Sequence, residues 1–469
     1  MKAQPRPPDV AARFRLRRKQ KNPEAFDRRL IAPMVMGSIL NPVNSSIIAV
    51  SLVPIGVALG APPAQTAWLV SALYLATAIG QPVVGRLVDL YGPRSLFLVG
   101  SGLVGVAGVL GLLAPNLPVL IVARVLLGFG TCAGYPAAMS LIHSESERTG
   151  HDRPGGVLTL LSITTQTIAV IGPTLGGLLI GLGGWRATIA VNIPLAVACL
   201  MLGALYLPRH HQRPDGRVRL DFPGIGLFAA TLVSLLLFLM TPNGAHWYLL
   251  VIALGAGAGF AVRELRTTAP FLDLRVLGGN FPLLLTYARS LLAYVVSYAF
   301  LYGYTQWLEE GRGLSASRAG LLLLPVFLVG IGLAALTGRH KELRGKLLVG
   351  AIGQIAACAL LLTLGGTSPI WLLVVVAVVL GVPQGLNGLA LQNSVYYQAD
   401  PERIGASAGL LRTFMYLGAM VASAATGGFF GPRADTGGLH HLAWFVLAVG
   451  GLFLVVTLFD RTLRHAAAK

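Results

Sequence analysis

Long apolar runs alternate with short polar segments along almost the whole chain. Many of these runs hold about 20 residues without Asp, Glu or Lys, enough for a helix to cross the ~30 Å hydrocarbon core of a bilayer. Because lipid offers no hydrogen-bond partners, such runs form helices rather than open sheets. The pattern therefore predicts an all-α integral membrane protein with about fourteen transmembrane helices.

Proline and glycine mark the connections between the runs, and many connections are short enough to make neighbouring helices antiparallel. The expected spans lie near residues 30–58, 65–88, 95–115, 118–142, 157–182, 187–207, 222–241, 246–262, 281–307, 317–337, 347–366, 369–395, 405–428 and 440–459. Composition agrees, since 12% of residues are charged, about half the share in soluble domains.

The distribution of Lys and Arg predicts the orientation. With a cytoplasmic amino terminus, 29 of the 36 basic residues fall in cytoplasmic segments and four fall in outer loops. This bias follows the positive-inside rule, so both termini are expected in the cytoplasm of a bacterial inner membrane. The basic tail between Arg13 and Lys21 is then a positive-inside anchor that contacts acidic headgroups rather than a nucleic-acid site.

Several chemistries are not indicated. The cysteines Cys132, Cys199 and Cys358 lie in apolar runs, and no Cys-x-x-Cys or Cys/His cluster accompanies them, so we expect neither metal sites nor disulfides. No phosphate-binding Gly-x-x-x-x-Gly-Lys-Ser/Thr occurs. The segment 405–409 has the spacing of a hydrolase elbow but no preceding strand. We therefore expect no enzyme, no cofactor and no ATP drive.

A short internal repeat suggests two related halves. Residues 85–92 and 338–345 share Gly, Arg, an acid, Leu and Gly at matching offsets, each in a loop after an even-numbered span. Parallel repeats with a substrate site between them are a transporter design. The expected organisation is a basic tail 1–29, a six-helix half 30–207, an inserted helix pair with linkers 208–280, a second six-helix half 281–460 and a tail 461–469.

Three motifs resemble the major facilitator superfamily. The loop with Gly85, Asp89, Gly92 and Arg94 resembles its signature loop, in which the carboxylate helps latch the halves; the natural partner here is the start of span thirteen, near Pro401. Pro93 stands where the family usually has a basic residue. In the repeat, Glu342 holds the acidic position. The segment from Arg124 to Gly130 resembles the family's Arg-x-x-Gln-Gly-x-Gly, whose Arg is implicated in proton handling.

Span five carries the third motif. Gly172, Pro173, Gly176 and Gly177 resemble the antiporter motif of the family's exporters. Gly172 and Gly176 share one face, so another helix can approach closely there; plain packing is the alternative reading. The hydrophobic pair at 222–262 and the segment 270–275 also resemble the fourteen-helix drug:proton antiporter branch.

The resemblance implies a cavity lined by spans one, four, nine and twelve, to which span thirteen adds. Polar side chains inside the membrane are first interpreted as functional. For each Asn or Tyr, however, an interhelical hydrogen bond is an equal alternative. The candidate cavity residues are Asn41, Asn44, Arg124, Tyr287, Arg289, Tyr294, Gln384, Asn387, Asn393, Arg412 and Tyr416. Arginines without a carboxylate suit a neutral or anionic amphiphile.

One feature departs from the resembled branch. That branch places an Asp in its first span, whereas this chain has Asn41 and Asn44 there and keeps all 18 acidic residues in loops or at span ends. Asp89, Glu342, Glu309 and Glu310 remain as candidates for proton coupling. The leading reading is a proton-coupled exporter of an amphipathic small molecule. A facilitator or importer of a metabolite and a non-transporting receptor or scaffold stay open; we take a monomer as the working expectation.

Overall fold

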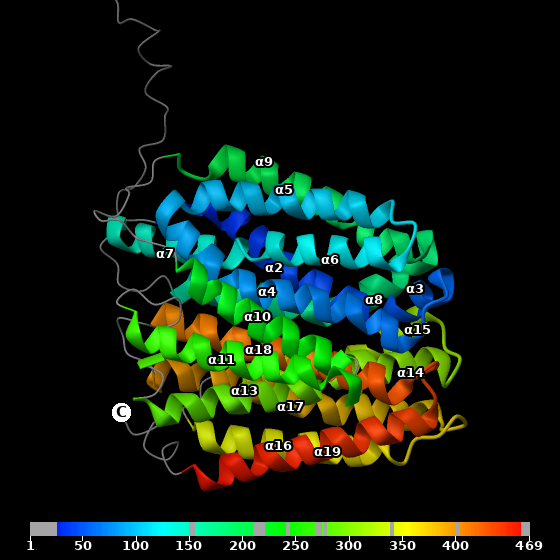
Figure 1. Cartoon of the computed structure of the whole chain (residues 1–469). Coiled ribbons are helices and arrows are strands. Elements are labelled where there is room, and N and C mark those ends of the chain that lie inside the picture. Colours follow the sequence, from blue (N-terminus) through cyan, green and yellow to red (C-terminus); the bar gives the residue numbers. More distant parts are fainter. Residues whose placement is uncertain are drawn as a thin grey trace, which may run out of the picture.

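The computed structural model describes residues 26–149, 155–209, 221–240, 244–267, 274–275, 279–337, 342–398 and 404–460. Every regular element in these ranges is helical, which confirms the all-α fold. The helices lie side by side in an elongated bundle, with the earlier part of the chain on one side and the later part on the other (Figure 1).

The elements follow the apolar runs closely. The N-terminal group comprises η1 (Arg28–Leu30), α2 (Ile31–Ile47), η2 (Ile48–Val50), α3 (Leu52–Leu59), α4 (Pro63–Tyr91), α5 (Pro93–Leu112), α6 (Leu117–Thr131), α7 (Gly134–Thr149), α8 (Gly155–Ala190) and α9 (Asn192–Tyr206). The middle pair comprises α10 (Phe222–Met240), η3 (Gly244–His246) and α11 (Trp247–Arg266). The C-terminal group comprises α13 (Phe281–Ala299), the π-helical turn η4 (Phe300–Tyr304), α14 (Thr305–Glu310), α15 (Ala316–Thr337), α16 (Leu343–Leu361), α17 (Ile370–Gln398), α18 (Ile404–Phe430) and α19 (Thr436–Phe459).

The number of spans is close to the expected one. In the described chain, twelve helices are long and apolar enough to cross a membrane, and the bent pair Ile171–Ala190 and Asn192–Tyr206 raises the number to thirteen if it is one span. The sequence prediction divides this region into two spans at a turn containing Gly183 and Gly184, both of which leave the helical conformation. Helix α8 packs on α2 and α15, whereas α9 packs on α5. The count of fourteen is not confirmed and stays a prediction.

The bundle has two ends, which we name after a turn glycine at each. Gly60, with φ of 65°, ends α3, and Gly92, with φ of 85°, joins α4 to α5. Only glycine adopts such positive φ values without strain. The Gly60 end lies on the right in Figure 1, with α3 and α14, and the Gly92 end lies on the left, with α7.

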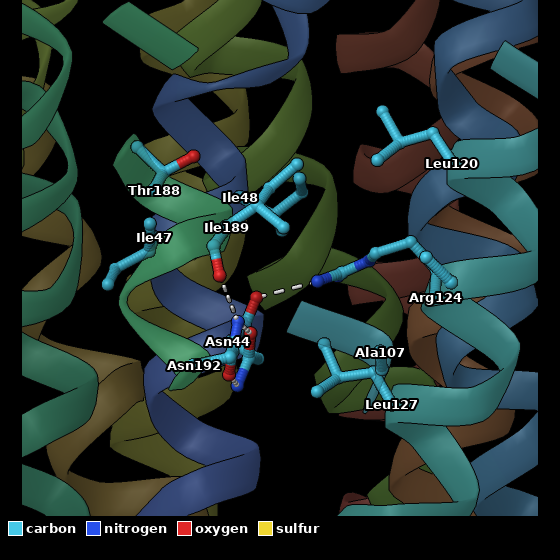
Figure 2. Close-up of a pocket in the computed structure, with 11 residues that line it drawn as sticks. Asn44, Ile47, Ile48, Ala107, Leu120, Arg124, Leu127, Thr188, Ile189 and Asn192 are labelled. Atoms are coloured by element: carbon cyan, nitrogen blue, oxygen red, sulfur yellow. Dashed lines mark hydrogen bonds between the residues drawn. The ribbon is translucent and has the colours of Figure 1, made fainter. Parts of the chain in front are cut away.

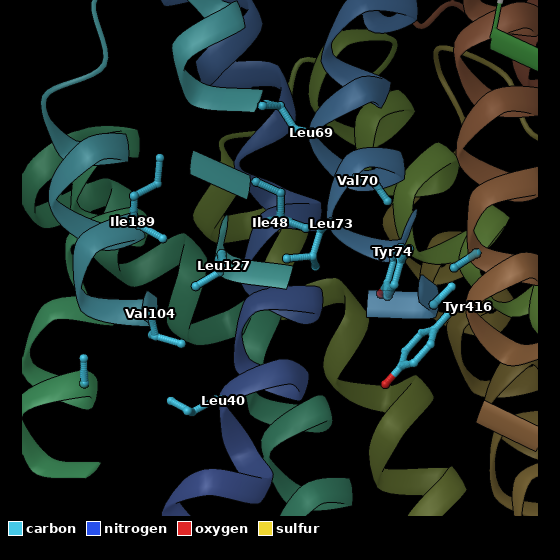
Figure 3. Packing of buried hydrophobic residues seen from close by; sticks show 14 of the residues in the cluster. Leu40, Ile48, Leu69, Val70, Leu73, Tyr74, Val104, Leu127, Ile189 and Tyr416 are labelled. Atoms are coloured by element: carbon cyan, nitrogen blue, oxygen red, sulfur yellow. The ribbon is translucent and has the colours of Figure 1, made fainter. Parts of the chain in front are cut away.

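Two seams join the N-terminal and C-terminal groups. Helix α4 packs along α18, and α8 packs along α15. Helix α10 lies against both α4 and α18, so the middle pair covers the first seam (Figure 1). Figure 3 shows the apolar packing beside this seam, where Leu69 and Leu73 on α4 adjoin Leu127 on α6. A Cβ on Gly128 would come within 2.6 Å of the Leu73 carbonyl, so small residues set the helix spacing.

Candidate functional site

Five tyrosines meet between the two groups of helices, and we call them the tyrosine seam: Tyr74, Tyr294, Tyr298, Tyr302 and Tyr416. The hydroxyls of Tyr74 and Tyr302 are 2.9 Å apart, and Tyr302 also donates to the Ser45 carbonyl at 3.3 Å. The Tyr74 ring stacks on Tyr416 at 5.5 Å and meets Tyr298 edge-on at 5.3 Å. The seam therefore carries both aromatic faces and hydroxyl groups at the junction.

Helical spacing explains how one element supplies three of these rings. Tyr294, Tyr298 and Tyr302 follow each other at intervals of four residues, which places them on one face of α13 and η4. Their ring centroids are 6.0 and 5.6 Å apart in succession. Tyr302 is buried, whereas Tyr294 and Tyr298 are only partly buried. Burial in this row of rings is therefore greatest at Tyr302 and lower at Tyr298 and Tyr294.

Arg412 extends the seam toward the Gly92 end. Its guanidinium lies 3.6 Å from the ring centroid of Tyr135, which belongs to α7 of the N-terminal group. Both side chains are partly buried. A cation over an aromatic face in such surroundings stabilises the contact by about 0.5–2 kcal/mol. Arg412 therefore joins the two groups through an attraction that leaves its charge available.

Arg124 lies within the N-terminal group, on α6. It donates through Nε to the Leu69 carbonyl at 3.0 Å and through a terminal nitrogen to the Asn44 carbonyl at 3.5 Å. Figure 2 shows it beside a cavity of about 10 Å³, which is about the smallest that can hold one water molecule. The cavity is too small for a substrate, and Arg124 here binds main-chain carbonyls.

Asn44 serves as a clamp between helices rather than as an open lining group. Its amide nitrogen donates to Asn192 Oδ1 at 2.6 Å, and Asn192 donates back to Asn44 Oδ1 at 2.9 Å. Both residues are buried, and the pair is visible in Figure 2. The contact joins α2 to α9 on the wall of the small cavity.

Replacing Asn44 by alanine is expected to cost about 1–3 kcal/mol of stability, because the side-chain oxygen of Asn192 then stays buried without the donor that Asn44 supplies. The thermal unfolding midpoint in detergent measures the change. Asn393, which is only partly buried on α17, gives the matched control, and an Asn393→Ala loss as large as that of Asn44→Ala would contradict this assignment.

Arg289 does not lie at the seam, contrary to the expected cavity. It is fully buried and forms an ion pair with Asp460 at the end of α19. Asp460 is at a span end, as expected, yet the helix packing buries it. Tyr287 lies in the same region, where its hydroxyl donates to the Ser407 carbonyl at 3.1 Å and its ring stacks on Phe414. We therefore place these two residues in the C-terminal packing at the Gly92 end.

The other candidate Asn and Gln residues are distributed over α2 and α17 and are not part of the tyrosine seam. Asn41 donates to Thr131 Oγ1 at 3.3 Å, which ties α2 to α6. Gln384 and Asn393 are partly buried on α17. Asn387 is buried, and a Cβ on Gly350 would overlap its amide, so it packs tightly against α16. Its amide atoms have no hydrogen-bond partner within the described structure. Only Arg412, Tyr294 and Tyr416 of the eleven expected residues join the seam.

The structure describes only part of the predicted signature loop between α4 and α5. Arg94 donates to the carbonyls of Leu207 and Ala204 at 3.1 and 3.0 Å, so it caps the end of α9. The side chain of Asp89 and the main chain near Pro401 lie outside the described residues, so the latch between them stays a prediction. Gly85 has open space around it, and Glu342 is exposed just before α16.

The span-five glycines allow close helix approach on two faces, as expected. A Cβ on Gly172 would overlap Ser46, and one on Gly176 would come within 2.8 Å of Val50, both in the N-terminal group. On the other face, Ser317 Oγ donates to the Gly177 carbonyl at 2.6 Å.

This second face belongs to the seam between α8 and α15. Thr174 donates to the Gly320 carbonyl at 3.2 Å, and a Cβ on Gly320 would lie 2.5 Å from the Pro173 carbonyl oxygen. At the other seam, Ser423 Oγ donates to the Ala67 carbonyl at 2.9 Å. These contacts close the two groups against each other at the Gly60 end.

Sequence reasoning missed several of the residues that build the site. Tyr74, Tyr298, Tyr302 and Tyr135 supply most of its aromatic surface. The four-residue spacing from Tyr294 to Tyr302 was a usable signal, since it marks one helix face. Tyr74 and Tyr135 had no such signal, because their contacts depend on which helices adjoin across the junction. Within the described residues, no cluster of His, Cys, Asp and Glu could hold a metal.

Comparisons with known proteins identify the family to which this architecture belongs. The family model of the Major Facilitator Superfamily matches residues 34–423. The chain is 31% identical over 439 residues to the uncharacterized MFS-type transporter YwoD of Bacillus subtilis, covering 91% of this chain and 95% of that protein. It is 30% identical over 400 residues to the cephamycin export protein CmcT of Amycolatopsis lactamdurans, covering 80% and 79%.

Two further matches agree with these. The methylenomycin A resistance protein of Streptomyces coelicolor is 25% identical over 442 residues, with 91% and 90% of the two chains covered. The crystal structure of the nucleoside transporter NupG shares the fold, with a TM-score of 0.64 at 12% identity, covering 92% of this chain and all of that one. The chain therefore belongs to the major facilitator superfamily of membrane transporters.

Proposed function

We propose that this transporter is a secondary active exporter of amphipathic small molecules, driven by protons, with the tyrosine seam and Arg412 as its substrate-binding surface. The observation that carries the proposal is the meeting of five tyrosines and a partly buried arginine between the two groups of helices. The names of two relatives, which describe antibiotic export and resistance, support the direction.

The two groups act as the moving bodies in this proposal, with residues 30–207 and 281–460 as the halves. The positive-inside rule assigns the Gly92 end to the cytoplasm and the Gly60 end to the outside. The inter-half hydrogen bonds described above lie in the middle of the bundle or at the Gly60 end. This arrangement corresponds to a conformation closed to the outside, and alternating access would open that end in turn.

The chemistry of the seam favours aromatic or amphipathic compounds. Ring faces bind flat apolar groups by stacking, and the Tyr hydroxyls bind polar substituents. Arg412 favours a neutral or anionic group over a cationic one, since its charge would repel a cation at short range. Because Arg289 is paired, this preference now rests on Arg412 alone at the seam.

Transport by purified protein in proteoliposomes tests the proposal. The probes are cephamycin, methylenomycin A, the anion fluorescein and the cation rhodamine 6G, each followed together with internal pH. We expect proton-coupled movement of neutral or anionic probes, reduced by roughly tenfold in Arg412→Ala and in Tyr298→Leu, because either change removes about 1–2 kcal/mol of contact. The matched control is Tyr304→Phe, since the Tyr304 hydroxyl binds the Leu373 carbonyl within the C-terminal group.

Each outcome separates the competing readings. Movement of a probe without protons would establish a facilitator, and movement of the cation alone would contradict the role of Arg412. No movement of any probe, with protein that still unfolds cooperatively, would favour a receptor or scaffold. Equal activity of wild type and Tyr298→Leu would place the substrate elsewhere.

A further inference from the structure

A buried carboxylate lies where the two halves close at the Gly60 end. Glu309, on α14, is 7% exposed, and its Oε1 has no hydrogen-bond partner in the described structure. Gln306, three residues earlier on the same helix, is 1% exposed and also has an unpartnered side-chain oxygen. The side-chain oxygens of Gln306 and Glu309 are thus two buried hydrogen-bond acceptors on one helix face without a donor. A proton bound to Glu309 would provide that donor.

The position of α14 links this site to closure. The helix packs against η2 and α3, which belong to the N-terminal half, as well as against α15 and η4 of its own half. Figure 1 shows α14, α3 and α15 gathered at the Gly60 end. When the halves separate at that end, α14 must part from α3, and water then reaches the carboxylate. Closure removes that water.

No cation compensates Glu309 among the described neighbours. The packed segments η2 and α3 contain no charged residue. Arg318 on α15 is exposed, Arg312 donates to the carbonyls of Gly366 and Ser368, and Arg433 donates to the Glu310 carbonyl.

The remaining titratable neighbours are also engaged with other groups. Glu310 accepts from the Ala434 amide at 2.6 Å, and Asp435 caps α19 at the Gly438 amide. His440 contacts the Leu364 carbonyl, and Tyr304 donates to Leu373. The adjacent Glu310 carries a negative charge, which disfavours a second one on Glu309. A buried carboxylate in such surroundings is held as the neutral acid.

The same helix face leads from Glu309 into the tyrosine seam. Tyr302 precedes Gln306 by four residues and Glu309 by seven, so the three lie on one side of the helix. Tyr302 faces the N-terminal half, as its contacts with Tyr74 and Ser45 demonstrate. The π-helical turn η4 lies between Tyr298 and Gln306, and such turns are frequent at functional sites. Glu309 is therefore the end of a polar stripe that reaches the substrate surface.

We propose that Glu309 is a proton-binding residue of the transport cycle, which takes up one proton from the water at the Gly60 end as the two halves close around it. The carboxylate is ionised when that end is open and hydrated, and it is the neutral acid when that end is closed. Linkage then gives the sign: acidic conditions favour the closed conformation and alkaline conditions favour the open one. This inference rests on the alternating access of the proposed function, but not on the identity of any transported compound.

The test measures conformation without a substrate. Spin labels on Ala58→Cys of α3 and Thr367→Cys between α16 and α17, both exposed positions at the Gly60 end, report the distance between the halves. The three native cysteines are buried, so labelling favours the introduced ones. In nanodiscs titrated upward from about pH 5, the ratio of open to closed wild-type protein should rise by up to roughly tenfold per pH unit above the ordinary pKa of a glutamate side chain.

Variants assign the response to this carboxylate. Glu309→Gln mimics the neutral acid and should stay closed across the range, whereas Glu309→Asp keeps a titratable group and should retain the response. Glu310→Gln is the matched control and should retain the pH response, which should end at a lower pH because the neighbouring negative charge is removed. A response that persists in Glu309→Gln, or that is missing from both wild type and Glu309→Asp, overturns the proposal. A pH response without transport of any probe would support the proton site while the proposed substrate class fails.

Discussion

Replacing Arg289 by alanine is expected to destabilise the protein by about 3–5 kcal/mol, one of the largest effects of any single substitution in the C-terminal half. The guanidinium and the Asp460 carboxylate are both buried, at 0% and 3% exposure. Removing the cation leaves a negative charge in low-dielectric surroundings without this neutralising group. The thermal unfolding midpoint of detergent-purified protein, together with its yield of monodisperse protein, measures the loss.

Two further variants separate the ion pair from a general effect of losing arginine. Arg344 also lies at the Gly92 end, where it donates to the Leu458 carbonyl at 3.1 Å from a partly buried position, and Arg344→Ala should cost less than about 1 kcal/mol. Replacing the whole pair, as Arg289→Met with Asp460→Leu, should recover most of the stability, because apolar groups need no compensating charge. A mild effect of Arg289→Ala with intact stability, but with lost transport of anions, would return Arg289 to the cavity.

Gly320→Val is expected to lower transport by roughly 5–150-fold by preventing closure at the Gly60 end. A Cβ at this position would lie 2.5 Å from the Pro173 carbonyl oxygen and 3.0 Å from its carbon, both backbone atoms that cannot rotate away. Forcing side-chain atoms into such a contact costs about 1–3 kcal/mol. The cost applies only when the seam is closed, so it shifts the balance toward the open conformation.

Helix α15 offers a matched control for this substitution. Gly332 lies on the same helix but has no neighbouring atom within 4 Å of its Cβ position. Gly332→Val should therefore leave the label distance at the Gly60 end and the transport rate unchanged, whereas Gly320→Val should lengthen the distance. Closure that is equally complete in both variants would show that α8 and α15 can separate slightly without consequence.

Sequence reasoning predicted the fold well because transmembrane helices are local features. The apolar runs and their flanking Pro and Gly residues follow from chain length and hydrogen bonding alone. The two glycine faces of α8 were also predictable, since Gly172 and Gly176 on one side and Gly177 on the other follow from helical periodicity. The bend that separates the two spans of this region was less predictable, because it depends on a turn at Gly183 and Gly184.

The site was predicted only in part because it depends on non-local pairing. Asp460 was treated as an end-of-span carboxylate, and only the packing of α19 against α13 shows that it meets Arg289. Asn44 was expected in the cavity, yet its amide meets Asn192, 148 residues away. Arg412 and Tyr416 were expected in the substrate cavity, which stays a prediction, and their partners Tyr135 and Tyr74 could not be inferred from spacing.

The helix pair α10 and α11 makes the two flanks of the transporter unequal toward lipid. Helix α10 packs on both α4 and α18, whereas the described residues give it no comparable packing on α8 or α15. Helix α11 is held against α10 by the salt bridge from Arg263 to Asp221. This salt bridge keeps the pKa of the Asp221 carboxyl below its usual value. A compound dissolved in the membrane therefore finds one flank shielded by two helices. The seam between α4 and α18 is therefore covered by α10 on the lipid side, whereas the seam between α8 and α15 has no comparable cover from the middle pair among the described helices.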